Sequence, residues 1–271
     1  MKPGQPLAGR RVLVTRPRAQ SRPLVDGLIA AGATAVAVPT IRIVPPAAGG
    51  PLDRALRRLD AYDWVIVTSA NGAQACLARA VALGLDLHAA RPSWAAIGPA
   101  TAAALREAGV TVAMTPSRFL TEAIPEELPD LAGARVLLPR TDAAPPALAE
   151  MLRARGASVD EITAYRTILA PARSRARLHR LIAGGEVDTV VFTSASTVRG
   201  LVRLLGDARD ALKRIEIACI GPVTAAAVIE EGLRPAVVAR EHTADGIIAA
   251  LAAHSDTGSQ GGSNARDRAA R

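Results

Sequence analysis

The stretch that decides the fold is Arg11-Val12-Leu13-Val14-Thr15-Arg16-Pro17, because its pattern returns as Arg135-Val136-Leu137-Leu138-Pro139-Arg140-Thr141. The two copies are 124 residues apart, and the same offset relates Gly32 to Gly156. Nearly equal offsets relate Thr68-Ser69-Ala70 to Thr193-Ser194-Ala195 and Ile97-Gly98-Pro99 to Ile220-Gly221-Pro222. Solenoid repeats are about 20 to 50 residues long. A period this much longer predicts two similar halves instead.

Each half alternates short β-branched runs with amphipathic helices. This alternation is typical of doubly wound parallel sheets. The predicted strands are residues 12–15, 64–67, 94–97, 136–138, 189–192 and 216–220, and the predicted helices are 23–31, 72–83, 100–108, 146–155, 197–205 and 223–231. We therefore expect an α/β protein with two doubly wound lobes related by internal duplication.

Two extended segments, residues 39–45 and 163–169, interrupt the alternation at corresponding places. Both lack helical spacing, so we predict that they form a two-stranded antiparallel connector between the lobes. Lobe one is then discontinuous, with residues 1–38 and 170–254, and lobe two is residues 46–162. The Gly- and Ser-rich residues 255–271 are predicted to be a disordered tail.

The amino-acid composition limits the kinds of ligand and partner that the chain is expected to bind. Its 271 residues are 49% apolar but only 2% aromatic, and the net charge is +8. A basic protein favours polyanionic ligands, while scarce aromatics argue against single-stranded nucleic acid. Apolar runs are too short to span a bilayer. The two cysteines fit a buried core in a reducing compartment, and the N-terminus lacks a signal-peptide core. We expect a cytoplasmic protein that binds neither nucleic acid nor membrane.

Six junctions between strand and helix share hydroxyl groups, turn residues and a helix N-terminus. Ligands of open parallel sheets bind beyond the carboxyl ends of the strands, where helix N-termini favour anions. The candidate binding residues are Arg16, Ser69, Asn71, Thr101, Arg140, Ser194, Ser196, Gly221 and Thr224. For any one junction taken alone, simple helix capping is the better explanation. Six together favour a surface that holds several carboxylates.

Other chemistries find little support in the chain. The Gly-Pro junctions do not match a dinucleotide fingerprint, and no phosphate-binding Walker loop is present. The four histidines (His88, His179, His242 and His254) lack metal-ligand spacing and are expected to be solvated. Tyr165 lies within a predicted connector strand, and its phenol could donate a proton. Aromatic packing at a hinge is the alternative role for this residue.

Six motifs in order resemble the uroporphyrinogen-III synthase family over about residues 11–251. These motifs are Val12-Leu13-Val14-Thr15-Arg16-Pro17, Thr68-Ser69-Ala70-Asn71-Gly72, Ile97-Gly98-Pro99-Ala100-Thr101, Thr193-Ser194-Ala195-Ser196-Thr197, Ile220-Gly221-Pro222-Val223-Thr224 and His242-Thr243-Ala244-Asp245-Gly246. The chain departs from the family pattern at Leu120, where the repeat predicts a threonine, and at Thr141 and Pro145, which follow Pro139-Arg140.

The resemblance implies a cofactor-independent, cyclising hydro-lyase of tetrapyrrole and heme biosynthesis. Such an enzyme closes hydroxymethylbilane to uroporphyrinogen III, with loss of water and inversion of ring D through a spiro intermediate. Tyr165 matches the connector tyrosine of the family, which is thought to assist departure of the substrate hydroxyl. We expect a monomer, with transient hand-over of substrate from hydroxymethylbilane synthase. A non-catalytic binding module and an enzyme acting on a phosphorylated metabolite remain the alternatives.

Overall fold

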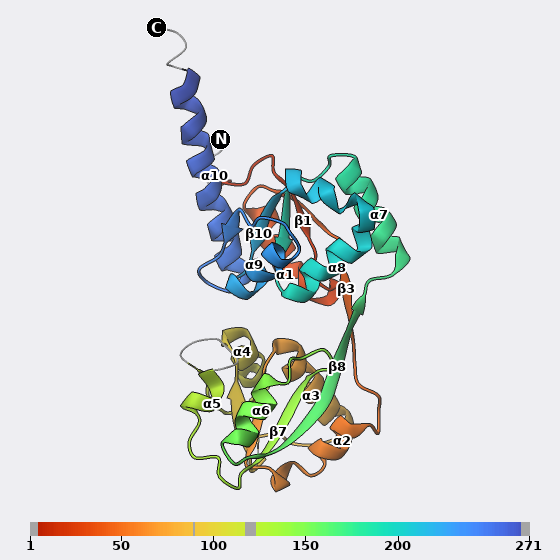
Figure 1. The fold of residues 1–271 in the computed structure, drawn as a ribbon, viewed down its shortest axis with the longest axis vertical. Coiled ribbons are helices and arrows are strands. Elements are labelled where there is room, and N and C mark those ends of the chain that lie inside the picture. The colour runs from red at the N-terminus through yellow and green to blue at the C-terminus, as the bar shows by residue number, and fades with distance from the viewer. Residues whose placement is uncertain (1–4, 89, 117–122, 267–271) are drawn as a thin grey trace. The chain divides into compact units, whose positions relative to one another are not determined.

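The computed structural model describes residues 5–88, 90–116 and 123–266. The chain divides into two compact units, whose elements are labelled in Figure 1. Unit 1 comprises Met1–Arg42 and Ile168–Arg271, and unit 2 comprises Ile43–Thr167. No helix among the described residues is long and apolar enough to cross a membrane.

Unit 1 contains a five-stranded sheet with the strand order β11-β10-β9-β1-β2, and every neighbouring pair in it is parallel. Its strands are β1 (Arg11–Val14), β2 (Thr34–Ala37), β9 (Thr189–Phe192), β10 (Glu216–Cys219) and β11 (Val237–Val238). Its helices are α1 (Arg18–Ala30), α7 (Ala172–Ala183), α8 (Ala195–Leu205), the 3-10 segment η2 (Gly206–Arg214), α9 (Pro222–Glu230) and α10 (Ala244–Arg266).

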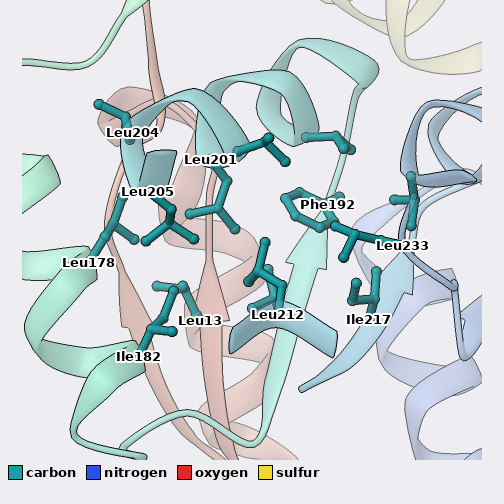
Figure 2. Close-up of a cluster of buried hydrophobic side chains, with 14 of the residues drawn as sticks. Leu13, Leu178, Ile182, Phe192, Leu201, Leu204, Leu205, Leu212, Ile217 and Leu233 are labelled. Atoms are coloured by element: carbon teal, nitrogen blue, oxygen red, sulfur yellow. The ribbon is translucent and has the colours of Figure 1, made fainter. Parts of the chain in front are cut away.

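Alternating side chains of the strands in unit 1 enter two separate cores. Leu13 packs with Phe192 and with the leucines of α7 and α8 on one face of the sheet, as Figure 2 shows. Its neighbours Val12 and Val14 pack on the other face against α1 and α10. Because successive strand residues point to opposite faces, this sheet has helices on both sides. The α/β class with a parallel sheet, predicted for lobe one, is confirmed for unit 1.

Unit 2 has a six-stranded sheet with the order β3-β8-β7-β4-β5-β6. The strands are β3 (Ile41–Val44), β4 (Trp64–Val67), β5 (Ser93–Ala96), β6 (Val112–Met114), β7 (Arg135–Thr141) and β8 (Ser158–Leu169). The helices are α2 (Pro51–Leu56), the 3-10 turn η1 (Leu59–Ala61), α3 (Ala70–Leu83), α4 (Pro99–Glu107), α5 (Ala123–Glu127) and α6 (Ala147–Ala154). The pairs from β8 through β6 are parallel, so the mixed α/β fold with parallel sheets is confirmed.

Corresponding hydrogen bonds recur in the two sheets. In unit 1 the Arg11 amide donates to the Asp188 carboxylate at 2.9 Å, and the Asp188 amide donates to the Arg11 carbonyl at 2.9 Å. In unit 2 Arg135 and Asp63 make the same two bonds, each at 2.8 Å. The sequence offsets of 124 and 125 thus relate residues with the same local geometry.

The ion pair between Arg11 and Asp188 makes the folding stability of the protein depend on pH in the acid range. Hydrogen bonding from the Arg11 side chain lowers the pKa of Asp188. The ion pair therefore stabilises the fold fully above about pH 3.9, the pKa of Asp188 in the unfolded chain. This stabilisation is lost as the pH falls through the lower pKa that Asp188 has in the folded protein. We expect Asp188→Asn to flatten the fall of Tm below about pH 4. The effect should be modest, because the side chain is 39% exposed. Asp26→Asn is the matched control, and an identical acid limb in both variants would contradict the assignment.

The structure changes the predicted elements at three places. α1 begins at Arg18, five residues before the predicted start, and contains Pro23. Residues 163–169 do not begin a new strand, because β8 is continuous from Ser158 and pairs with β7 up to Tyr165. β3 lies next to β8 in the sheet, while the antiparallel connector and its hinge role stay a prediction.

The third change concerns the predicted tail. α10 continues to Arg266, so residues 255–266 are helical where we predicted irregular chain; residues 267–271 lie outside the described part. The Ser255 hydroxyl donates to the Leu251 carbonyl at 2.9 Å, a bond typical of a helix interior. Glycines in this stretch misled the prediction, because they lower helix propensity without forbidding a helix.

Deleting Ser255 to Arg271 is expected to leave Tm and activity nearly unchanged. The buried anchors of α10, Ile247 and Leu251, precede the deletion and keep the helix on the core of unit 1. Differential scanning fluorimetry and turnover measurements on the truncated chain test this. A large fall in Tm would show that the last turns of α10 are docked.

Candidate active site

The carboxyl ends of parallel strands bring the predicted binding residues to one edge of each sheet. In unit 1 these strands are β1, β9 and β10, followed by Arg16, Ser194 and Gly221. In unit 2, β4 and β5 are followed by Ser69 and Gly98. The junction predicted at residues 138–141 is wrong, because β7 continues through Arg140 to Thr141 and α6 begins only at Ala147.

Two of the three predicted serines, Ser69 and Ser194, act as helix caps. Ser69 Oγ accepts a hydrogen bond from the Gly72 amide at 3.1 Å at the start of α3. Ser194 Oγ accepts from the Thr197 amide at 3.3 Å, and Thr197 Oγ1 accepts from the Ser194 amide, which completes a capping box. Asn71 and Ser196 are the second residues of these helices and are half-buried. The capping alternative therefore holds for the two serines.

Tyr165 lies within hydrogen-bonding distance of one of these caps. Its phenol oxygen is 3.1 Å from Ser69 Oγ, and either group can donate. The ring is 7% exposed and packs in the unit 2 core beside Val67 and Ala164. The ring and the hydroxyl group of Tyr165 thus lie in different environments. The ring belongs to the hydrophobic core of unit 2, and the phenol oxygen lies at the carboxyl edge of the sheet, where β4 leads into α3.

The first turns of α4 and α9 each contain one threonine that is largely buried as a whole residue. Thr101 and Thr224 are 3% and 4% exposed. Neither hydroxyl forms a hydrogen bond with any residue that the structure describes. The amides of a helical first turn also have no intrahelical acceptor. Both hydroxyl groups thus keep a donor and acceptor available, so both positions are suited to hold an oxygen of a ligand.

Glycines precede these two helices for different physical reasons. Gly98 has a φ of +78°, a conformation that favours glycine, and a side chain there would meet no described atom within 4 Å. Gly221 has a φ of 179°, which any residue adopts. A methyl group on Gly221 would instead come within 2.8 Å of Cδ2 of His242. This contact could not be predicted from the sequence, because nothing in the pattern of residues indicates which of them, 21 positions apart, lie together in the fold.

Substituting the two glycines is expected to separate these causes. Gly98→Ala should lower the free energy of unfolding by about 1–3 kcal/mol through backbone strain. Gly221→Ala should displace the His242 ring, and His242→Ala should relieve that effect. Urea unfolding of the single and double variants gives both coupling energies. Equal coupling of His242 to Gly98 and Gly221 would contradict this explanation.

The arginines at these edges differ in how their charge is balanced. Arg16 is half-buried, burial lowers its pKa, and it has no hydrogen bond or ion pair with a described residue. Arg140 is 5% exposed and is bound to Glu161 at 2.9 Å and to the Pro145 carbonyl. Arg166 pairs with Asp142 at 3.6 Å. Arg16 is thus the most available of the three for an external anion.

The histidines are not all solvated, contrary to our expectation. His179 is half-buried and its Nε2 lies 3.1 Å from the Leu204 carbonyl, which links α7 to α8. Within residues 5–88, 90–116 and 123–266, no three His, Cys, Asp or Glu side chains are grouped to hold a metal ion. Leu120, one of the two departures from the family pattern, lies outside the described residues.

Comparisons with known proteins agree on one family. Residues 22–249 match the family described as uroporphyrinogen-III synthase HemD. The uroporphyrinogen-III synthase of Synechococcus elongatus is 32% identical over 261 residues, covering 91% of this chain and 96% of that protein. A putative uroporphyrinogen-III synthase of Methanothermobacter thermautotrophicus is 35% identical over 252 residues, covering 88% and 96%.

A solved structure has the same fold. The crystal structure of a mutant uroporphyrinogen III synthase from Thermus thermophilus matches with a TM-score of 0.68 at 24% identity, covering 92% of this chain and 100% of that one. The family match extends over most of the sequence, and relatives above 30% identity align with about nine tenths of it. The chain therefore belongs to the uroporphyrinogen-III synthase family.

Proposed function

We propose that this protein is a uroporphyrinogen-III synthase, which converts hydroxymethylbilane to uroporphyrinogen III in tetrapyrrole biosynthesis. The observation that carries the proposal, beside family membership, is the set of unsatisfied donors at the carboxyl edges of the sheets. These are the Arg16 guanidinium, which has no ion pair, the hydroxyls of Thr101 and Thr224, and the first-turn amides of α4 and α9.

These donors suit a linear tetrapyrrole whose rings carry acetate and propionate groups. Hydrogen bonds to charged groups contribute about 1.5–3 kcal/mol each, and helix N-termini attract anions. Many modest contacts can therefore hold a flexible substrate in one folded shape. That shape brings the terminal hydroxymethyl carbon close to the substituted carbon of ring D, which is the orientation effect that the reaction requires.

We propose that Tyr165 is the general acid. The C–O bond of the hydroxymethyl group breaks with electron push from the pyrrole nitrogen, and the departing hydroxyl takes a proton and leaves as water. The substituted carbon of ring D attacks the resulting azafulvene to give the spiro intermediate. The original bond between this carbon and its methylene bridge then cleaves, which leaves a second azafulvene. The freed methylene carbon bonds to the other α-carbon of ring D, and that carbon loses its hydrogen as a proton. Ser69, 3.1 Å from the phenol, would orient its proton.

Several finer features belong to the same proposal. We propose a cyclising hydro-lyase that needs no cofactor and acts in the cytoplasm as a monomer, with substrate handed over from hydroxymethylbilane synthase. The two units would derive from one duplicated plan, as their matching strand orders and Arg–Asp hydrogen bonds suggest. The β3–β8 pair would form the antiparallel connector that the family resemblance implies.

Ligand-induced stabilisation tests the substrate class. A ligand that binds only the folded state raises Tm, and the stabilisation grows with the logarithm of the ligand concentration above Kd. We expect the octacarboxylate uroporphyrin III to raise Tm, and Arg16→Gln to reduce that shift. Stabilisation by a sugar phosphate without any response to the tetrapyrrole would favour an enzyme of phosphorylated metabolites and contradict the proposal.

A further inference from the structure

Helix α7 concentrates positive charge on one side of unit 1. Its twelve residues, Ala172–Ala183, include Arg173, Arg175, Arg177 and Arg180 and contain no acidic residue. The wider segment of residues 172–214 has nine Lys or Arg and four Asp or Glu, so its net charge of +5 is more than half of the +8 of the chain. The basic character of the protein is thus local.

The inner side of α7 is fully used by the fold. Ser174, Leu178 and Ile182 are buried and follow one another at intervals of four residues. Figure 2 shows Leu178 and Ile182 directed into the core beside Leu13 and Leu205. The four arginines are exposed, and none forms a hydrogen bond or ion pair with a described residue.

The arginines also oppose the helix that carries them. Arg173 and Arg175 lie in or next to the first turn of α7, which has no acidic residue. Positive charge near a helix N-terminus is unfavourable, because the helix dipole is positive there. Local stability therefore does not explain these residues. These arginines oppose the helix dipole and form no ion pair within the described protein, so we expect them to serve in contact with another molecule.

Helical spacing gives the outer face of α7 a defined shape. Arg173, Arg177 and Arg180 follow one flank at intervals of four and three residues, and Arg175 lies on the opposite flank. Between the flanks are the exposed alanines Ala172, Ala176 and Ala183. Small side chains let a second helix axis approach closely, and the flanking guanidinium groups would then meet carboxylates on that helix.

We propose that the outer face of α7 is a docking surface for an acidic α-helix of a partner protein. The alanine ridge with arginines on both sides fits a helix that carries glutamates or aspartates along its two flanks. The face has no aromatic side chain for base stacking and no bulky apolar side chain to insert into a bilayer. Charge complementarity of this kind chiefly raises the association rate and is weakened by salt.

The test uses the full chain and an alanine-based helical peptide of about 20 residues with glutamates flanking an alanine ridge. A scrambled peptide of equal charge is the peptide control. The variant replaces Arg173, Arg175, Arg177 and Arg180 by glutamine. Its matched control replaces four exposed arginines elsewhere, Arg22, Arg57, Arg106 and Arg234, by glutamine. Circular dichroism verifies folding, and removing the α7 arginines should leave Tm equal or higher.

Fluorescence anisotropy at low salt should show wild-type binding that favours the patterned over the scrambled peptide. We expect the α7 variant to bind about tenfold or more weakly and the control variant to change little. Equal losses in the two variants, or no preference for the patterned peptide, would overturn the proposal. Tighter wild-type binding to duplex DNA or phosphatidylglycerol vesicles, lost in the α7 variant, would overturn it in favour of nucleic acid or membrane.

Discussion

Turnover of Tyr165→Phe is expected to fall roughly tenfold to a hundredfold or more, toward the lower end of the about 10²- to 10⁴-fold that general-acid assistance usually contributes. The substitution removes only the phenol oxygen, so the buried ring keeps its packing in the unit 2 core. Steady-state kinetics with hydroxymethylbilane give the effect on kcat. The isomer ratio supplies a second readout, because unprocessed substrate closes spontaneously to the uninverted isomer I.

Two matched variants separate catalysis from packing. Tyr62→Phe removes the same atom from the same core, where the Tyr62 hydroxyl donates to Asp160 at 2.6 Å. It should retain wild-type turnover. Ser69→Ala removes the partner of Tyr165 and the cap of α3, and it should lower the free energy of unfolding by about 0.5–2 kcal/mol. Unchanged rate and isomer ratio in Tyr165→Phe would reduce the tyrosine to a packing residue.

Phe192→Ala is expected to lower the free energy of unfolding of unit 1 by about 3–5 kcal/mol. Phe192 is fully buried at the end of β9, among the leucines of α8 and η2 in Figure 2. Its removal leaves a cavity directly before the Thr193-Ser194 junction. Ile229→Ala, at a position 62% exposed, is the control and should change stability little.

Two probes can assign this loss to unit 1. Trp64 and Trp94 are the two tryptophans of the chain, and both lie in unit 2. Circular dichroism reports helices of both units, whereas tryptophan fluorescence reports unit 2. In urea we expect Phe192→Ala to shift the circular dichroism transition more than the fluorescence transition. A loss no larger than that of Ile229→Ala would contradict the packing assigned to Phe192.

The sequence was most informative where local pattern and long-range repeat agreed. The Arg11 and Arg135 segments predicted β1 and β7, and both strands occupy corresponding positions in their sheets. β-branched runs bounded by turn residues mark buried parallel strands well, since hydrophobic burial on both faces leaves few alternatives. The helices after Ser69 and Ser194 were predicted from the alternation of β-branched runs and amphipathic stretches, and both begin two residues before the predicted starts.

Features set by contacts between distant residues could not be predicted in this way. The hydrogen bond between Tyr165 and Ser69 joins residues 96 positions apart. The contact of His242 with Gly221 depends on where the loop before α10 folds back. Arg140 resembles a free carboxylate clamp in sequence, but the turn after β7 places the Pro145 carbonyl beside its guanidinium, and the neighbouring strand β8 supplies Glu161. Tertiary structure decides such pairings, and one sequence carries no direct signal of them.

Analysis of the isomer formed from freshly made hydroxymethylbilane tests the central claim most directly. Substrate alone closes to uroporphyrinogen I, so an enzyme that inverts ring D must raise the share of isomer III as its concentration increases. We predict that the wild-type protein yields mainly isomer III without added metal or cofactor, and that heat-denatured protein yields isomer I. Isomer I alone from the native protein, at every concentration, would contradict the account and favour a binding module.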